Sequence, residues 1–278
     1  MQLAKAVPPL GVILAAAVVL GVGAFAFNDA RSAADLAPRR VGVLTITFDD
    51  AFRNQYVHAL PVLQQYELRG TTFLTTAFIG DVAGTSLMAA MTWAEAAEWR
   101  DAGWEIGAHT ETHRDLPPLA AVEIKAELAY PAIRIYQELG VVPTSFSSPH
   151  GYIDDRVRAM VMDTFDAHVR TRPIAEQVSA GLNHMPPLDP YDISRFEMSR
   201  GMAPSLACDK IELAVEQGSW LVLSFHGILP EPSSSDEERY FYSVADLAAI
   251  AQCTRTYIDA GTLESATIAE VLTRQAGV

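Results

Sequence analysis

From Val41 to the C-terminus, short apolar runs rich in β-branched residues alternate with longer stretches of helical pattern. Runs such as VGVLTITF, TTFLTTAF and SWLVLSFHG have the length and composition of buried strands. The stretch TWAEAAEWRDAG is typical of a helix, because Thr92 and Glu95 match a capping box and Gly103 matches a C-terminal stop. This alternation, sustained over roughly 230 residues, predicts one α/β barrel rather than two separate domains.

The same patterns place the individual elements. Asn54 matches the N-cap of the first helix, Pro61 predicts a kink or a late start in it, and Pro131 predicts a kink in a later one. We expect strands over residues 41–48, 71–78, 104–109, 144–151 (with a turn), 166–172, 192–198 and 219–227, and helices over residues 54–68, 92–103, 120–140, 155–165, 205–218, 243–261 and 267–272.

The N-terminal segment differs from the rest of the chain. About 20 uncharged, mostly apolar residues follow Lys5, which is enough to cross a bilayer. The run is longer than a usual signal-peptide core, which favours an uncleaved anchor, with a cleaved signal peptide as the alternative. We therefore expect residues 1–40 to form a hydrophobic helix, as anchor or signal segment, plus a linker. Residues 41–278 would then form a domain outside the cytoplasm, membrane-anchored or secreted.

Charge and cysteine content narrow the classes of function. The net charge of −14 argues against a nucleic-acid-binding protein, which needs a basic face. Hydrophobic residues make up 50% of the chain and charged residues 19%, which argues against disorder. Cys208 and Cys253 lack a metal-type spacing, so they form either one disulfide in an exported protein or two buried thiols.

Carboxylates and histidines follow four of the predicted strands. In parallel α/β folds, ligands bind at the carboxyl ends of the strands. Taken singly, an Asp-Asp pair is most often a turn, and a histidine after a strand is most often structural. Together these residues predict a functional site, because all of them follow the carboxyl ends of strands, where ligands bind. They are Asp49-Asp50, His109 with His113, Pro149-His150-Gly151, and His226.

Two histidines and one carboxylate make a three-ligand metal site that leaves a position for water. Such an open site suits Zn²⁺, with Fe²⁺ or Co²⁺ as alternatives. The sequence therefore predicts a divalent metal centre at the carboxyl ends of the strands.

Four short motifs carry a resemblance to a known family. TFDD at residues 47–50, HTETH at 109–113, SPHG at 148–151 and LSFHGI at 223–228 are similar, in order and spacing, to motifs of the polysaccharide deacetylases. This family is also called the NodB homology domain or carbohydrate esterase family 4. The resemblance covers the chain from about Val41 onward. It implies a distorted (β/α) barrel with fewer than eight strands, and removal of N-acetyl or sometimes O-acetyl groups from polysaccharides.

The resemblance implies that Asp50, His109 and His113 bind the metal. It implies that Asp49 is the general base that takes a proton from the attacking water. Adjacent residues at a strand end point in different directions, so one carboxylate can face the metal and the other the water.

The resemblance also assigns the residues that act on the substrate. His226 would protonate the leaving amine as general acid. The backbone N–H of His150, in the turn from Pro149 to Gly151, would hold the oxyanion.

The chain departs from the family pattern in two motifs. The family's third motif usually carries an arginine that orients the base, whereas this chain has Ser147 and Ser148 there. Our hypothesis is that Arg195, in DISRF, reaches Asp49 instead, with a plain strand-end ion pair as the alternative. In the fifth motif the family prefers an apolar residue two positions before the histidine, and here that residue is Ser224.

We therefore expect a metal-dependent deacetylase that acts on a polymer containing N-acetylglucosamine, such as an exopolysaccharide, peptidoglycan or a chitin-like chain. Its partners would be this polysaccharide and, through the N-terminal segment, the membrane. Two alternatives stay open: an O-acetyl esterase with the same metal site, and a non-catalytic carbohydrate-binding protein on the same fold.

Overall fold

The computed structural model describes residues 41–80, 86–171 and 181–274. The chain divides into two compact units, Met1–Pro38 and Arg39–Val278, and the described residues all belong to the second. The hydrophobic helix expected in residues 1–40 lies outside the described residues. Within them, no helix is both long and apolar enough to cross a membrane.

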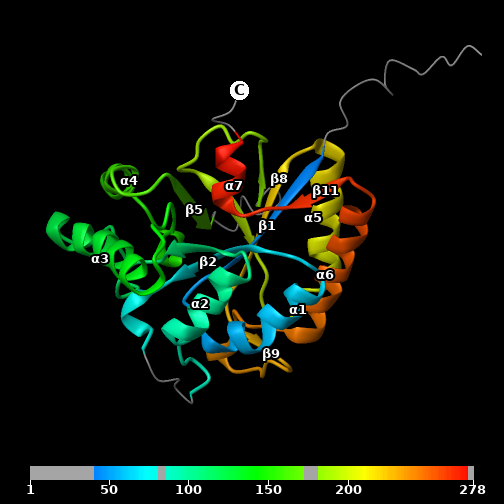
Figure 1. The fold of residues 1–278 in the computed structure, drawn as a ribbon, viewed down its shortest axis with the longest axis horizontal. Coiled ribbons are helices and arrows are strands. Elements are labelled where there is room, and N and C mark those ends of the chain that lie inside the picture. Colours follow the sequence, from blue (N-terminus) through cyan, green and yellow to red (C-terminus); the bar gives the residue numbers. More distant parts are fainter. Residues whose placement is uncertain (1–40, 81–85, 172–180, 275–278) are drawn as a thin grey trace, which may run out of the picture. The chain divides into compact units, whose positions relative to one another are not determined.

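Seven parallel strands close into a barrel (Figure 1). The sheet closes because β1 pairs with the whole of β8, from Val43 opposite Trp220 to Phe48 opposite Phe225. The expected barrel of fewer than eight strands is therefore confirmed for the described residues. In order around the barrel, the strands are β1 (Gly42–Phe48), β2 (Gly70–Leu74), β3 (Glu105–Ala108), β4 (Ser145–Ser147), β5 (Ala167–Thr171), β7 (Ile193–Glu197) and β8 (Trp220–Phe225).

Four short strands were not expected from the sequence. β11 (Leu263–Ser265) pairs in parallel with the first half of β1, and β6 (Leu182–Asn183) pairs antiparallel with β8. β9 (Ile228–Leu229) and β10 (Tyr242–Ser243) form a separate pair beyond β8. Segments of two or three residues are too short to show an alternating pattern.

The helices lie around the barrel (Figure 1). They are α1 (Leu60–Gln65), α2 (Trp93–Asp101), α3 (Ala121–Leu139), α4 (Asp155–Met162), α5 (Pro204–Gln217), α6 (Val244–Asp259) and α7 (Ile268–Thr273). A π-helical turn η1 (Gln55–Ala59) precedes α1, and 3₁₀ turns form η2 (Thr76–Phe78), η3 (Pro149–Gly151) and η5 (Asp236–Glu238).

Some local expectations are confirmed and others are wrong. The capping box of α2 is present. Pro61 does not delay the start of the first helix, because the helical run passes without a break from the π-helical turn η1 into α1. Asn54 does not cap a helix, because its side chain instead bonds Leu87 O and Ile228 N. The strand expected over residues 71–78 ends at Leu74 and gives way to η2.

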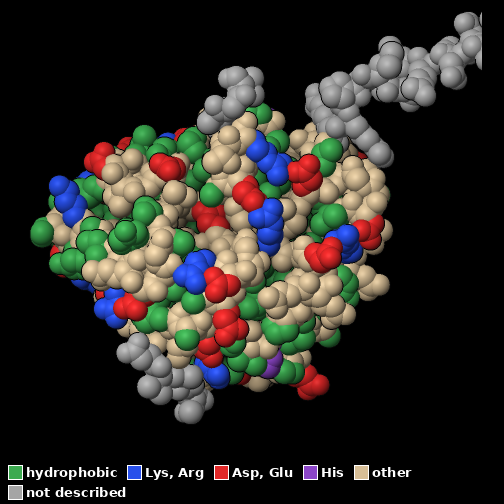
Figure 2. Space-filling model, in the orientation of Figure 1, with side chains coloured by type: hydrophobic (Ala, Val, Ile, Leu, Met, Phe, Trp, Pro, Cys, Tyr) green, Lys and Arg blue, Asp and Glu red, His purple; other side chains and the backbone are tan. Residues whose placement is uncertain are grey.

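Side-chain alternation along the strands creates two cores. Val43, Phe73, Val169 and Val222 belong to one apolar cluster inside the barrel, which Ile268 and other α7 residues close. The residues between them on the strands pack outward under the helices in a larger cluster. The outer face of α3 exposes Val122, Tyr130, Ile133 and Tyr136, and hydrophobic side chains gather on that side of the molecule (Figure 2).

At the amino-terminal end of the barrel, which we call the floor, lies the carboxylate of Glu105, a residue of intermediate exposure. Glu105 accepts hydrogen bonds from Ser145 Oγ at 2.6 Å, Thr71 Oγ1 at 2.8 Å and Ala269 N at 2.9 Å. Burial raises the pKa of Glu105 although these donors oppose the shift. The side chain thereby joins β2, β3 and β4 to the start of α7.

Cys208 on α5 and Cys253 on α6 are free thiols in the structure. Burial, together with a hydrogen bond to Cys253, raises the pKa of the Cys208 thiol to about 12. Cys208 therefore behaves as a small packing residue rather than a reactive thiolate.

Candidate active site

Three of the predicted ligands meet at the opposite, carboxyl-terminal end of the barrel, which we call the mouth. One ligand atom from each of Asp50, His109 and His113 lies within 4.8 Å of the others. The Nε2 atoms of His109 and His113 lie 3.3 and 3.1 Å from Asp50 Oδ1. Neither approach has the geometry of a hydrogen bond, and Asp50 Oδ1 is buried without a hydrogen-bond partner. A carboxylate oxygen that faces two imidazole nitrogens in this way fits a site for a cation.

The ring of His109 is held in the orientation that a metal ligand needs. Its Nδ1 lies 2.8 Å from the carbonyl oxygen of Ser147, and the side chain is buried. Because a carbonyl only accepts, Nδ1 carries the proton and the Nε2 lone pair points toward Asp50. Its backbone oxygen accepts a hydrogen bond from Thr75 Oγ1, which fixes the strand end as well.

The backbone around this cluster is strained. Of the six non-glycine residues with positive φ among those described, five belong to the three segments that carry the site. Each such residue costs on the order of 1–3 kcal/mol and persists only where its surroundings enforce it. The five are Asp50 (73°), Ala51 (60°), Thr110 (64°), His113 (60°) and His150 (57°).

Asp49 lies beside the cluster and is fully buried. Its Oδ2 accepts hydrogen bonds from Arg195 Nη1 at 2.6 Å and Ser147 Oγ at 3.1 Å, whereas Oδ1 has no partner. Burial opposes ionisation, but the Arg195 guanidinium, with smaller contributions from the neighbouring histidines, lowers the pKa of Asp49 overall. Asp49 is therefore a carboxylate with one oxygen neutralised and the other available.

The predicted contact between Arg195 and Asp49 is present. Arg195 lies on β7, is 3% exposed, and also donates from Nη1 to Ser147 Oγ at 3.0 Å and from Nε to Thr171 Oγ1 at 3.0 Å. The serine that stands in the third motif thus hydrogen-bonds both the guanidinium and the carboxylate. The arginine reaches the carboxylate from a different strand.

His226 follows β8 at the edge of the mouth. Its Nδ1 lies 3.8 Å from Glu197 Oε1, close enough for charge attraction although no hydrogen bond forms. Gln55 links it to Asp49, because its Nε2 donates to the backbone oxygens of Asp49 at 2.6 Å and His226 at 3.1 Å. Gln55 and Glu197 carry no motif signal, so the sequence did not point to either.

The turn from Pro149 to Gly151 places His150 next to the cluster. The rings of His150 and His113 meet edge to face with centroids 4.9 Å apart. His150 Nδ1 lies 2.6 Å from Asp115 Oδ1, and both side chains are half exposed. The side chain of His150 therefore faces the rim of the mouth. Its backbone role in holding an oxyanion stays a prediction.

His168 contacts this turn through Ser148, and no motif marks its position in the sequence. Its Nε2 lies 3.0 Å from Ser148 Oγ and its Nδ1 3.2 Å from Tyr191 O. Burial lowers the pKa of His168 to about 4, so the ring is neutral at pH 7.

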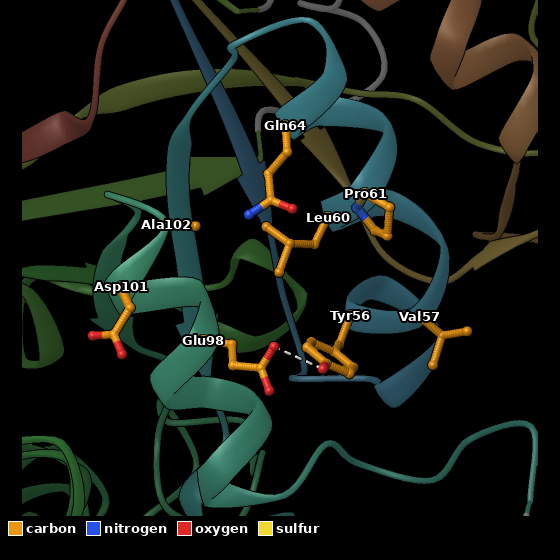
Figure 3. A pocket seen from close by; sticks show the side chains of 8 residues that line it. All are labelled: Tyr56, Val57, Leu60, Pro61, Gln64, Glu98, Asp101 and Ala102. Atoms are coloured by element: carbon orange, nitrogen blue, oxygen red, sulfur yellow. Dashed lines mark hydrogen bonds between the residues drawn. The ribbon is translucent and has the colours of Figure 1, made fainter.

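A groove of about 570 Å³ lies between η1, α1 and α2 (Figure 3). Apolar side chains such as Val57 and Leu60 line it, and Tyr56 bonds Glu98 across it at 2.9 Å. No histidine and none of the residues at the mouth lines this groove. The chemistry-bearing side chains of the described residues instead meet at the mouth.

Comparisons with known proteins agree with this site. The family model for polysaccharide deacetylases matches residues 37–164, a range that contains Asp49, Asp50, His109, His113 and His150. This part of the chain belongs to the polysaccharide deacetylase family. The expected family is thus confirmed, and with it a fold and a candidate metal site of the family type.

Two curated relatives illustrate the extent of the match. Chitin deacetylase 1 of Cryptococcus neoformans var. grubii is 47% identical over 58 residues, which are 21% of this chain and 12% of that protein. The putative polysaccharide deacetylase YxkH of Bacillus subtilis is 27% identical over 161 residues, 58% of this chain and 53% of the relative. The chain thus matches at most about half the length of these curated relatives.

Solved structures of the family share the fold. A deacetylase called T48, solved with its substrate, superposes with a TM-score of 0.53 at 15% identity, over 84% of this chain and 92% of that one. The family 4 carbohydrate esterase of Streptomyces lividans, solved with acetate, gives 0.51 at 18% identity, over 81% and 91% of the two chains. At these identities the comparison supports the barrel and not a particular substrate.

Proposed function

We propose that this protein is a metal-dependent hydrolase that removes N-acetyl groups from a polysaccharide containing N-acetylglucosamine. One observation carries the proposal: the Asp50, His109 and His113 side chains converge beside the buried Asp49–Arg195 pair. Family membership supports the reaction class, and the local chain geometry supports the assignment of residues. The apolar run in residues 1–40 supports an extracytoplasmic location, either membrane-anchored or secreted.

The residues at the mouth fit a divalent ion. Asp50 Oδ1 is buried without a hydrogen-bond partner, and the bond from His109 to Ser147 O presents the Nε2 lone pair. One carboxylate and two imidazoles suit Zn²⁺, with Co²⁺ or Fe²⁺ as alternatives. When bound, such an ion polarises the acyl carbonyl and makes a water molecule more acidic.

The proton transfers fall to residues of this chain. Asp49 accepts the proton of the attacking water through Oδ1, since Arg195 and Ser147 occupy Oδ2. Arg195 keeps Asp49 ionised at neutral pH. The backbone N–H of His150 stabilises the oxyanion on the acyl carbon.

His226 donates a proton to the departing nitrogen, which would otherwise leave as a poor amide anion. Glu197 Oε1 lies 3.8 Å from Nδ1 of His226, on the side of the ring that carries this nitrogen. Gln55 holds the backbone of His226 against that of Asp49, so that acid and base keep their separation.

Acetate release tests the proposal and its ester alternative together. We expect the full chain, stripped of metal and reloaded with Zn²⁺ or Co²⁺, to release acetate from chitooligosaccharide. His226→Ala should slow this amide reaction far more than release from acetylated xylan, because an alkoxide leaves more easily than an amide anion. Glu138→Gln, a change on the surface of α3 where Glu138 pairs with Arg134, is the control.

Acetate release from acetylated xylan alone would indicate that the protein is an O-acetyl esterase. No release from either substrate by a protein that binds the ion would favour the non-catalytic carbohydrate-binding alternative.

A further inference from the structure

The loop between the two histidine ligands is anchored on both sides. On the side of β2, Thr76 Oγ1 bonds Glu111 and Ala77 N donates to Glu111 O at 2.9 Å. On the side of α3, Thr112 donates twice to Glu127, from its backbone N to Oε2 at 2.8 Å and from Oγ1 to Oε1 at 2.5 Å. Glu127 is thus a two-armed clamp on the residue that precedes His113.

Glu127 is an unusual residue for its position. It is 5% exposed, although it lies on a helix whose outer face reaches solvent. Among the described residues, no lysine or arginine pairs with it within salt-bridge distance. A buried carboxylate without a cation is costly unless its hydrogen bonds and its surroundings compensate. Here the compensation comes from Thr112, one residue from a predicted metal ligand.

The segment that the clamp holds is strained. Thr110 and His113 both have positive φ, and His113 N donates to Thr110 Oγ1 at 2.9 Å. That tight turn sets the direction of the His113 side chain toward Asp50, at 3.1 Å. A strained turn persists only where its surroundings enforce it, and Glu127 is the residue of α3 that does so.

We propose that Glu127 is a positioning residue for the metal site. By holding Thr112 at two atoms, it keeps His113 Nε2 opposite Asp50 and so sets the affinity for the divalent ion. The inference rests on the proposed metal site. It adds to that site a residue from α3 that touches no ligand atom.

Zn²⁺ affinity, measured by competition with a chelator on the full chain, tests the clamp without reference to catalysis. Glu127→Gln loses the charge and one of the two acceptor atoms. We expect Zn²⁺ binding to weaken by about 10–100-fold, the range found for groups that orient metal ligands. Glu138→Gln, also on α3 and paired only with Arg134 on the surface, should bind as the wild type does.

A second variant separates positioning from folding. Thr112→Val removes the hydrogen bond from the Thr112 hydroxyl to Glu127 and keeps the one from the backbone N–H. It should therefore weaken Zn²⁺ binding less than Glu127→Gln does. Its circular dichroism spectrum should stay native. The absorption bands of bound Co²⁺ should shift in both variants, because they report ligand geometry.

Unchanged affinity and an unchanged Co²⁺ spectrum in both folded variants would overturn the clamp and leave the metal site standing. A wild-type protein that binds neither ion would instead overturn the proposed metal site, and the clamp with it.

Discussion

The two ends of the barrel bury carboxylates in opposite ways. At the floor, Glu105 accepts three hydrogen bonds, and both of its oxygens have partners. At the mouth, Asp49 is fully buried and Asp50 is 9% exposed, but Oδ1 of each lacks a hydrogen-bond partner. Buried polar atoms without partners are rare in folded proteins and are commonest where a function needs them. At the floor, the hydrogen bonds of the carboxylate are satisfied without any other group. At the mouth, carboxylate oxygens remain free to coordinate an ion or to accept a proton.

The pKa shifts follow the same division. Glu105 has no cation beside it, so burial raises its pKa, whereas Arg195 lowers that of Asp49. Backbone strain is concentrated at the mouth as well. The floor is therefore arranged for stability, and the mouth is arranged for chemistry at some cost in stability.

Of these variants, Asp49→Asn should have the largest effect. It should lower the rate of catalysis at the mouth and leave the floor unchanged. Loss of a general base lowers kcat by about 10²–10⁴-fold. Zn²⁺ should still bind, because Asp50, His109 and His113 remain. Acetate release and Zn²⁺ titration measure the two properties separately. A variant that turns over at the wild-type rate would remove Asp49 from the chemistry.

Arg195→Ala should be the most destabilising single change. It leaves the Asp49 charge buried without its cation, which costs about 3–5 kcal/mol. Urea unfolding measures the loss. The double variant Arg195→Ala/Asp49→Asn should recover much of it, since the unpaired charge is then gone. A double variant no more stable than the single one would show that packing, not charge, explains the effect.

The pH dependence of stability should differ between the two ends. His168, under the mouth, has a folded pKa of about 4, below its ordinary 6.5. Its contribution is fully present above pH 6.5 and is lost as the pH falls toward 4, by on the order of 3 kcal/mol in total. Glu105 has a raised pKa, so its contribution has the opposite sign and grows as the pH falls.

Removing each group should therefore change the slope of stability against pH in opposite directions. His168→Gln should flatten the loss of stability between pH 6.5 and 4, and Glu105→Gln should steepen it. Urea unfolding at a series of pH values gives both slopes. Identical slopes in the two variants would contradict the assigned pKa directions.

Glu105→Gln at neutral pH should have the smallest effect, confined to stability. The amide offers one acceptor where the carboxylate offers two, so one buried donor loses its partner at a cost of about 1–3 kcal/mol. Chelator competition should give wild-type Zn²⁺ affinity. A change in that affinity would show that the floor and the mouth are coupled.

The sequence predicted the parts of the molecule that depend on local pattern. Strand ends are marked by a change from apolar to polar residues, so a metal site of carboxylates and histidines at the mouth could be predicted from one chain, and the family resemblance identified its ligands as Asp50, His109 and His113. The hypothesis that Arg195 reaches Asp49 followed from the absence of the family's arginine in the third motif.

The supporting residues could not be predicted, for a physical reason. Gln55, Glu127 and His168 act through single long-range contacts from a π-turn, a helix face and the outer side of a strand. None of these positions has a period or spacing that distinguishes it from an ordinary polar residue. Only the three-dimensional structure shows which side chains reach the site.

Zn²⁺ binding by the full chain decides whether the mouth is built around an ion. Titration of the metal-free protein should give one Zn²⁺ per chain, and Asp50→Asn should abolish tight binding while Glu105→Gln leaves it intact. No tight binding by the wild type, or equal binding by Asp50→Asn, would contradict the account.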